Sequence, residues 1–196
     1  RRGSVVIIRH ICAALVCFSL IGFLETYAGE LHVVSSPMQL VGENGPGFSL
    51  MESSEIGISF RNDLDARKGA ANRVLFNGSG VAVGDVNGDG LPDLFFCGID
   101  SPNQFYRNLG QWKFERVTIP TSLETLGAAS RGAVFADLNG NDRLDLLVST
   151  IGMGVRVFWN QGEFSFQDAT QEFGTETQYG ATSMALADVD GNGTLD

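Results

Sequence analysis

Three acidic segments of nine residues place oxygen-bearing side chains at alternate positions. They begin at Asp85, Asp137 and Asp188, and each ends on a further aspartate. Oxygens at alternate positions of a short loop can converge on one point, and calcium takes about six to eight oxygen ligands. Magnesium fits this pattern less well, because it takes few protein ligands and retains its waters. The segments therefore predict three calcium-binding loops.

The predicted ligands are the first, third, fifth, seventh and ninth residues of each loop, and the seventh contributes its backbone carbonyl oxygen. In the first loop they are Asp85, Asn87, Asp89, Leu91 and Asp93. In the second loop they are Asp137, Asn139, Asn141, Arg143 and Asp145. In the third loop they are Asp188, Asp190, Asn192, Thr194 and Asp196. Carboxylates crowded into so short a loop repel one another, and a bound cation would offset that repulsion.

The second loop differs from the other two at its sixth position. Asp142 stands there, whereas the first and third loops have Gly90 and Gly193. A tight turn at this position needs a positive φ, which aspartate adopts at a higher cost than glycine. Asn139 and Asn141 also reduce the negative charge of this loop. We therefore expect the second loop to bind calcium more weakly than the first.

An EF-hand begins in a similar way but requires a glutamate at the twelfth position, between two helices. The twelfth residue here is Phe96 or Val148, and each lies in an apolar run typical of a strand. The EF-hand is therefore excluded.

The loops lie inside a longer sequence repeat with a period near fifty residues. Their first residues are 52 and 51 positions apart, at 85, 137 and 188. An apolar run precedes each loop, at 81–84, 133–136 and 184–187. Matched runs follow the first two loops, at 94–96 and 146–148, at 104–108 and 156–160, and around Phe114 and Phe166. Such a period is typical of proteins built from stacked structural repeats.

Each repeat is predicted to form four short β-strands. The first run is apolar throughout, so we expect both of its faces to be buried, whereas the later runs mix apolar and polar residues. Residues 108–110 and 160–162 supply Asn and Gly for the turn between the third and fourth strands. The fold class is therefore predicted to be all-β, a β-propeller of four-stranded blades, with two complete blades and parts of others.

Two segments before the first loop have separate interpretations. Residues 48–58 are similar to 164–174, the end of a repeat, and are predicted to form the outer strand of the last blade, closing the ring. A stray edge strand is the alternative. Residues 59–76 are an insertion with four basic residues, interpreted as a solvated loop.

The first 28 residues have the composition of a secretory signal peptide. Three arginines precede the uncharged stretch 11–24, and small residues follow at 26 and 28. As a helix this stretch would rise about 21 Å, less than the hydrocarbon core of about 30 Å. We expect cleavage before Gly29, a tether over 29–47, no membrane span after cleavage, and a secreted or cell-surface protein. An uncleaved anchor lengthened by residues 5–8 is the alternative.

Residues 81–96, with the sequence VAVGDVNGDGLPDLFF, closely resemble the FG-GAP/VCBS repeats of integrin α-like β-propellers. The stretch FYRN at 105–108 is most similar to the secreted cartilage acidic protein group, whose members end in an ASPIC/UnbV domain. The resemblance covers about residues 48–196. It implies a propeller of about seven blades, calcium in the loops between the first two strands, and adhesive or unassigned roles.

Two classes of function compete. The first is a non-catalytic, calcium-stabilised scaffold that binds an extracellular protein or glycan. The second is the propeller portion of a secreted carbohydrate-active enzyme, such as a lyase or hydrolase, with its catalytic residues elsewhere. Catalysis needs a positioned base and nucleophile, but His32 is the only histidine after residue 28 and the clustered carboxylates are assigned as ligands. The scaffold is therefore favoured, and a net charge of −10 argues against a nucleic-acid partner.

Overall fold

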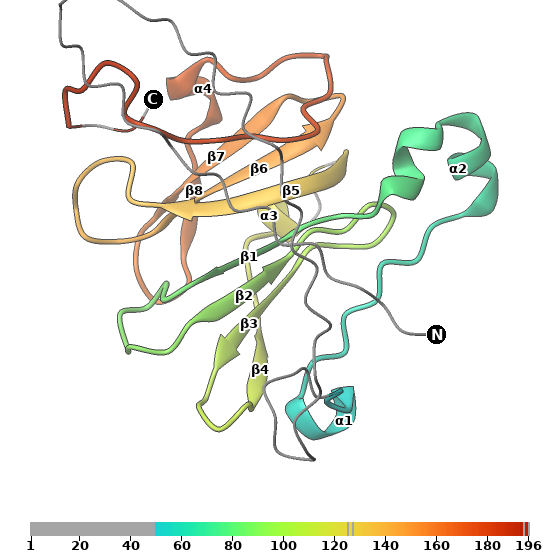
Figure 1. Ribbon diagram of the computed structural model, residues 1–196, viewed down its shortest axis with the longest axis horizontal. Helices are drawn as coiled ribbons and strands as arrows, with labels where there is room; N and C mark the ends of the chain where they lie inside the picture. Colours follow the sequence, from blue (N-terminus) through green and yellow to red (C-terminus); the bar gives the residue numbers. More distant parts are fainter. Residues whose placement is uncertain (1–49, 125, 127, 194, 196) are drawn as a thin grey trace, which may run out of the picture. The chain divides into compact units, whose positions relative to one another are not determined.

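The computed structural model describes residues 50–124, 126, 128–193 and 195 (Figure 1). Contacts within the chain divide it into two units, residues 1–50 and 51–196, and every helix and strand described below belongs to the second unit. The predicted signal peptide (1–28) and tether (29–47) lie outside the described residues. Among the residues that are described, no helix is long and apolar enough to cross a membrane.

The described strands form two four-stranded antiparallel sheets, each made of consecutive strands in chain order. The first sheet contains β1 (Val81–Gly84), β2 (Asp93–Phe96), β3 (Gln104–Asn108) and β4 (Phe114–Val117). The second sheet contains β5 (Ala129–Ala136), β6 (Asp145–Ile151), β7 (Val155–Asn160) and β8 (Phe166–Asp168). The all-β class and the four-strand repeat are therefore confirmed for the first and second repeats.

The register of the first sheet gathers one apolar layer on one face. Ala82 of β1 lies opposite Phe95 of β2, which lies opposite Phe105 of β3. Residues opposite each other on neighbouring strands share a face, so these three side chains point the same way. All three are buried in the core.

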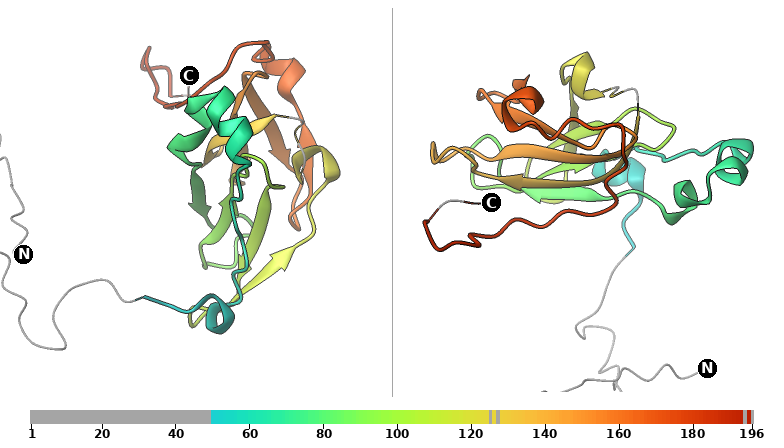
Figure 2. Two further views of the ribbon diagram at one scale, coloured as in Figure 1. Left: turned by 90° about the vertical axis from the view of Figure 1, so that its right-hand side faces the viewer. Right: turned by 90° about the horizontal axis from the view of Figure 1, so that it is seen from above.

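The core lies between the two sheets, which pack against each other (Figures 1 and 2). The ring of Phe105 has its centre 5.9 Å from that of Phe135, 5.2 Å from that of Phe164 and 5.9 Å from that of Phe166. Strands β1 and β5 are neighbours across this interface, and the Gly80 N–H just before β1 donates to the Arg131 carbonyl at 2.8 Å. One aromatic side chain of the first repeat is thus enclosed by three from the second.

The turns between the third and fourth strands have the predicted chemistry. Asn108 Oδ1 accepts the Gly110 N–H at 2.8 Å, and Asn160 Oδ1 accepts the Gly162 N–H at 2.8 Å. Both glycines have positive φ, 79° and 89°, a conformation that glycine adopts without steric cost. Both predicted turns are confirmed.

The prediction that the first strand is buried on both faces is wrong for β1. Ala82 faces the core, but Val81 and Val83 on the opposite face are 47% and 58% exposed. Among the described residues, nothing covers these two side chains as the second sheet covers Ala82. A strand that is apolar at every position can bury both faces, but a face is buried only where a neighbouring element packs against it.

Two predicted strands are absent. Residues 50–58 contain the single-turn helix α1 (Ser53–Ile56) and no strand, so the outer strand proposed for 48–58 is wrong over its described part. Residues 184–187 also lack strand structure. Neither segment forms ladder hydrogen bonds with a strand among the described residues, although Gly57 lies against Phe114 of the edge strand β4.

Short helices account for the remaining differences. The insertion 59–76, predicted as a loop, contains α2 (Ala66–Ala71) and most of the 3-10 helix η1 (Arg73–Asn77), although most of its residues are exposed as expected. Helices α3 (Thr121–Glu124) and α4 (Thr170–Phe173) follow the fourth strand of each repeat. Both α1 and α4 end on a glycine with positive φ, Gly57 and Gly174, so the similarity between 48–58 and 164–174 includes a shared single-turn helix.

Candidate metal-binding loops

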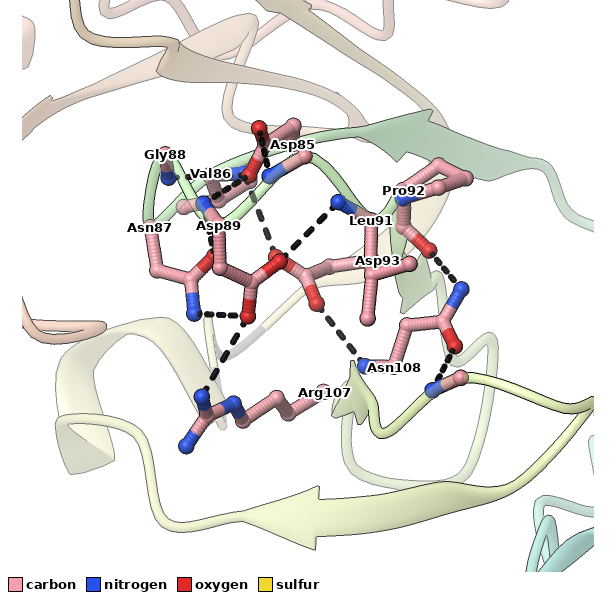
Figure 3. A network of polar contacts seen from close by, with 12 residues as sticks. Asp85, Val86, Asn87, Gly88, Asp89, Leu91, Pro92, Asp93, Arg107 and Asn108 are labelled. Carbon is pink, nitrogen blue, oxygen red and sulfur yellow. Dashed lines mark hydrogen bonds and ion pairs between the residues drawn. The ribbon is translucent and has the colours of Figure 1, made fainter.

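The first acidic loop, between β1 and β2, folds around the carboxylate of Asp85 (Figure 3). Asp85 Oδ1 accepts the N–H groups of Gly88 at 2.8 Å and Asp89 at 3.1 Å, and its Oδ2 accepts the Gly90 N–H at 2.8 Å. Asp89 Oδ1 in turn accepts the Leu91 N–H at 3.0 Å. Short polar side chains thus replace the ladder partners that a turn of this tightness cannot have.

The second and third loops repeat this pattern. In each, the first carboxylate accepts backbone N–H groups three, four and five residues later. The donors in the second loop are Gly140, Asn141 and Asp142, which bond to Asp137 at 2.8, 3.1 and 2.8 Å. The donors in the third loop are Gly191, Asn192 and Gly193, which bond to Asp188 at 2.7, 3.0 and 2.8 Å. The three loops therefore share one local fold.

The last aspartate of the first loop is fully buried. Asp93 Oδ2 accepts the Val86 N–H at 3.1 Å and Asp93 Oδ1 accepts the Asn108 N–H at 2.9 Å. Burial raises the pKa of Asp93 above its ordinary value, and the nearby carboxylates of Asp89 and Asp85 raise it further, while the two N–H groups act in the opposite direction. A buried carboxylate held by neutral donors is a favourable neighbour for a cation.

Asp145 takes the same place in the second repeat. It is also fully buried, and its carboxylate accepts the Leu138 N–H at 3.1 Å and the Asn160 N–H at 2.9 Å. Burial raises its pKa, and the Asp137 carboxylate adds to that effect. The ninth position of both loops is therefore a carboxylate set at the start of the second strand.

Asp89 is directed to other partners at the surface. Its Oδ2 accepts the Asn87 amide at 2.7 Å and the Arg107 guanidinium at 3.2 Å (Figure 3). Hydrogen bonds lower the pKa of Asp89: the Asn87 amide has the largest effect, followed by the Leu91 N–H and then the Arg107 guanidinium. Asp89 therefore stays ionised at neutral pH.

The donor set of the loops fits a hard cation. Carboxylates, side-chain amides and the backbone carbonyls of Leu91 and Arg143 offer oxygen alone, which calcium prefers. Two of these carboxylates, Asp93 and Asp145, are buried with neutral N–H partners. In the part of the chain that the structure describes, no three His, Cys, Asp or Glu side chains are placed to hold a metal. An ion in these loops would therefore depend on amide and carbonyl oxygens as well, and Thr194 and Asp196 of the third loop lie outside the described residues.

The sixth position of each loop has the left-handed backbone expected from the sequence. The φ angles of Gly90, Asp142 and Gly193 are 83°, 62° and 88°. Asp142 therefore adopts the conformation that glycine adopts in the other two loops. The predicted backbone difference of the second loop is confirmed, and its weaker affinity stays a prediction.

Asn108 and Asn160, predicted from the sequence only as turn residues, also contact the acidic loops. Asn108 Nδ2 donates to the Pro92 carbonyl at 2.9 Å, and Asn160 Nδ2 donates to the Leu144 carbonyl at 3.1 Å. Asn160 Nδ2 also donates to the Val86 carbonyl of the first loop at 2.9 Å. The two asparagines occupy matched positions 52 residues apart, and this match in the sequence could have indicated that both have the same role in their repeats.

Comparison with known proteins gives two findings. The FG-GAP-like repeat matches residues 85–148 and 144–196, more than half of the chain. The chain is also similar to Cartilage acidic protein 1 of Xenopus tropicalis, with 26% identity over 140 residues. That alignment covers 67% of this chain and 22% of the relative, so the chain matches about a fifth of the relative's length. The residues matched by the FG-GAP-like repeat include all three acidic loops.

Proposed function

Because the chain belongs to the FG-GAP-like repeat family, we propose that it is part of an extracellular, calcium-stabilised β-propeller that acts as a non-catalytic scaffold for binding or adhesion. Its partner is an extracellular protein or glycan. The observation that carries the proposal is the shared backbone fold of the three acidic loops, each closed around its first carboxylate.

Calcium is supported by the chemistry of the loops. The first loop offers the side-chain oxygens of Asp85, Asn87 and Asp89, and Asp93 adds a buried carboxylate. Oxygen-only donors with several carboxylates favour calcium over the softer transition metals. When bound, the ion would offset most of the negative charge of the loop and hold β1 and β2 together at this end.

A propeller is supported by the equivalence of the two sheets. Phe135 and Phe164 of the second repeat pack on Phe105 of the first. The residues 52 positions before them, Val83 and Trp112, are 58% and 68% exposed. The outer face of the first sheet therefore exposes apolar residues at the positions that the second sheet uses to pack on its neighbour. This is expected if another blade covers the outer face of the first sheet.

The junctions between repeats also recur. The Ser130 N–H donates to the Gly98 carbonyl at 3.0 Å where the first repeat leads into the second. The Ala181 N–H donates to the Thr150 carbonyl at 2.8 Å where the second leads into the third. These donors and acceptors are 51 and 52 residues apart, so successive repeats are joined by the same contact. A constant junction is what a ring of similar blades requires.

A non-catalytic role is supported by how the reactive groups are used. A cavity of about 470 Å³ near the β2–β3 connection is lined by Lys68, Asp100 and Glu124, among others. Lys68 pairs with Asp100, and Glu124 pairs with Arg116 at 2.7 Å. Charged groups that satisfy one another are poorly suited to proton transfer, which needs a free base of matched pKa.

Thermal unfolding of the full chain with and without calcium tests the proposal. Millimolar calcium should raise the melting temperature above that in EDTA, because a ligand at about 100 times its Kd adds about 2.7 kcal/mol per site. Magnesium at equal concentration is the control and should raise it less. Superimposable melting curves in calcium and in EDTA would refute a stabilising role for calcium.

A further inference from the structure

A continuous path of buried hydrogen bonds joins the first acidic loop to the second. Asp93 accepts the Val86 N–H, and the Val86 carbonyl accepts the Asn160 side-chain amide at 2.9 Å. The Asn160 backbone N–H then donates to Asp145 at 2.9 Å. Asp93, Val86, Asn160 and Asp145 are each at most 4% exposed. The ninth residues of the two loops are thus connected through only two intervening residues.

The first repeat contains a natural control for this path. Asn108 makes every bond that Asn160 makes within its own repeat: to the last aspartate of the loop, to the carbonyl before that aspartate, and from the turn glycine. The bond to the Val86 carbonyl is the additional one, and it crosses between repeats. Comparing the two asparagines therefore isolates this single contact.

We propose that Asn160 couples the first and second acidic loops, so that an ion bound in one loop increases the affinity of the other. The inference rests on the proposed calcium function. Asn160 is a positioning residue and not a ligand: its side chain holds the Val86 carbonyl while its backbone holds the Asp145 carboxylate. When one loop becomes ordered around an ion, part of the ordering needed by the other loop is already achieved, which is positive cooperativity.

The size of the effect follows from the single bond that carries it. A net hydrogen bond corresponds to a factor of about three to ten in an equilibrium constant. We therefore expect an empty second loop to lower the calcium affinity of the first about three- to tenfold. By linkage, an empty first loop should lower the affinity of the second by the same factor.

The test is a mutant cycle on the full chain, with each loop observed separately by NMR. The Gly90 amide reports on the first loop, because it donates to Asp85. Calcium is titrated into the wild type, Asn108→Ala and Asn160→Ala, each with and without Asp137→Ala, which removes the first ligand of the second loop. Asp137→Ala should weaken calcium binding at Gly90 three- to tenfold in the wild type and in Asn108→Ala, and should have no effect in Asn160→Ala. An equal effect in both asparagine variants would overturn the proposal.

Two further readouts keep the outcome interpretable. If Asn160→Ala does not fold, the wild type and the single Asp137→Ala variant suffice, because equal affinities of the first loop in these two proteins overturn the coupling. If calcium shifts no loop amide at all, the proposed calcium function fails. Hydrogen exchange in EDTA then tests whether the Asn160 bond to the Val86 carbonyl connects the two loops. Asn160→Ala should accelerate exchange of the Gly88 and Gly90 amides of the first loop, whereas Asn108→Ala should leave the amides of the second loop unchanged. Unchanged exchange in Asn160→Ala would overturn the proposal.

Discussion

Each acidic loop begins with an aspartate because one carboxylate can serve three backbone donors. Asp85 accepts the N–H groups of Gly88, Asp89 and Gly90, none of which has a partner in a strand. Buried N–H groups without hydrogen-bond partners are costly, and the short side chain of an aspartate in the same loop can accept several of them. The same carboxylate retains lone pairs for a cation. At the residue scale, the proposed binding role and the local fold therefore use the same atoms.

The positive φ of Asp142 leads to a prediction at this scale. A left-handed conformation costs a non-glycine residue about 1–2 kcal/mol, whereas glycine loses about 0.5–1 kcal/mol more conformational entropy on folding. We expect Asp142→Gly to stabilise the chain in EDTA by about 0.5–1 kcal/mol and to strengthen calcium binding by the second loop. Denaturant unfolding and calorimetric titration measure the two effects. Asp142→Asn removes the same charge and is the control: if it matches the glycine variant, charge and not backbone strain is responsible.

Cys97 gives a second prediction for a single residue. It is completely buried, and burial raises the pKa of its thiol to about 12. The reactive species is the thiolate, which is almost absent at pH 8 for such a group. A disulfide reagent should therefore modify Cys97 slowly in the folded chain and rapidly in denaturant. Fast modification under native conditions would show that the strand β2 region opens readily.

At the scale of the loop and its flanking strands, the ninth aspartate has a different task from the others. Asp93 is the first residue of β2 and Asp145 is the first residue of β6. Each accepts an N–H from its own loop and an N–H from the end of the third strand. These carboxylates therefore tie three segments of a repeat together.

This division of tasks predicts contrasting variants of the first loop. Asp93→Ala would leave the buried N–H groups of Val86 and Asn108 without acceptors, and each such group costs about 1–3 kcal/mol. We expect it to lower the melting temperature even in EDTA. Asp89→Ala, at the exposed surface, should weaken calcium binding by the first loop with little change of the melting temperature in EDTA. Equal melting temperatures of the two variants in EDTA would contradict the assignment.

At the scale of the whole molecule, stability depends on the interface between sheets. Phe105 is fully buried and contacts three aromatic rings of the second repeat, whereas Val83 faces away from that interface and is more than half exposed. A single four-stranded sheet cannot bury its own apolar face and needs a neighbouring sheet to cover it. The two repeats should therefore unfold together.

Substitution of Phe105 tests this dependence. Phe105→Ala leaves a cavity between the sheets, and we expect it to reduce the free energy of unfolding by about 3–5 kcal/mol. Val83→Ala is the matched control. As long as the outer face of the first sheet is uncovered, it should change the free energy of unfolding much less. Denaturant unfolding followed by circular dichroism measures both. A small effect of Phe105→Ala would show that the sheets are stable independently.

How much was predictable from the sequence depends on whether a feature is local. The Asn–Gly turns, the left-handed position of Asp142 and the strands β1 to β8 follow from residues close together in the chain, and all were predicted. The helices α1 and α4 were missed, because a short polar segment ending in glycine fits a strand end and a single helical turn equally well. The calcium ligands stay a prediction for all three loops.

The amino-acid sequence by itself determined the repeat: where the strands of the first two repeats lie, where each turn reverses, and which oxygens lie in each acidic loop. Only the tertiary structure decided that Ala82 is buried while Val83 is exposed, and that Asn160, unlike Asn108, reaches the loop of the neighbouring repeat. The physical reason is that hydrogen-bond geometry within a turn or hairpin depends on nearby residues, whereas burial and cross-repeat contacts depend on what lies against each face. Two repeats with the same local pattern therefore differ in the burial and cross-repeat contacts that their neighbours supply.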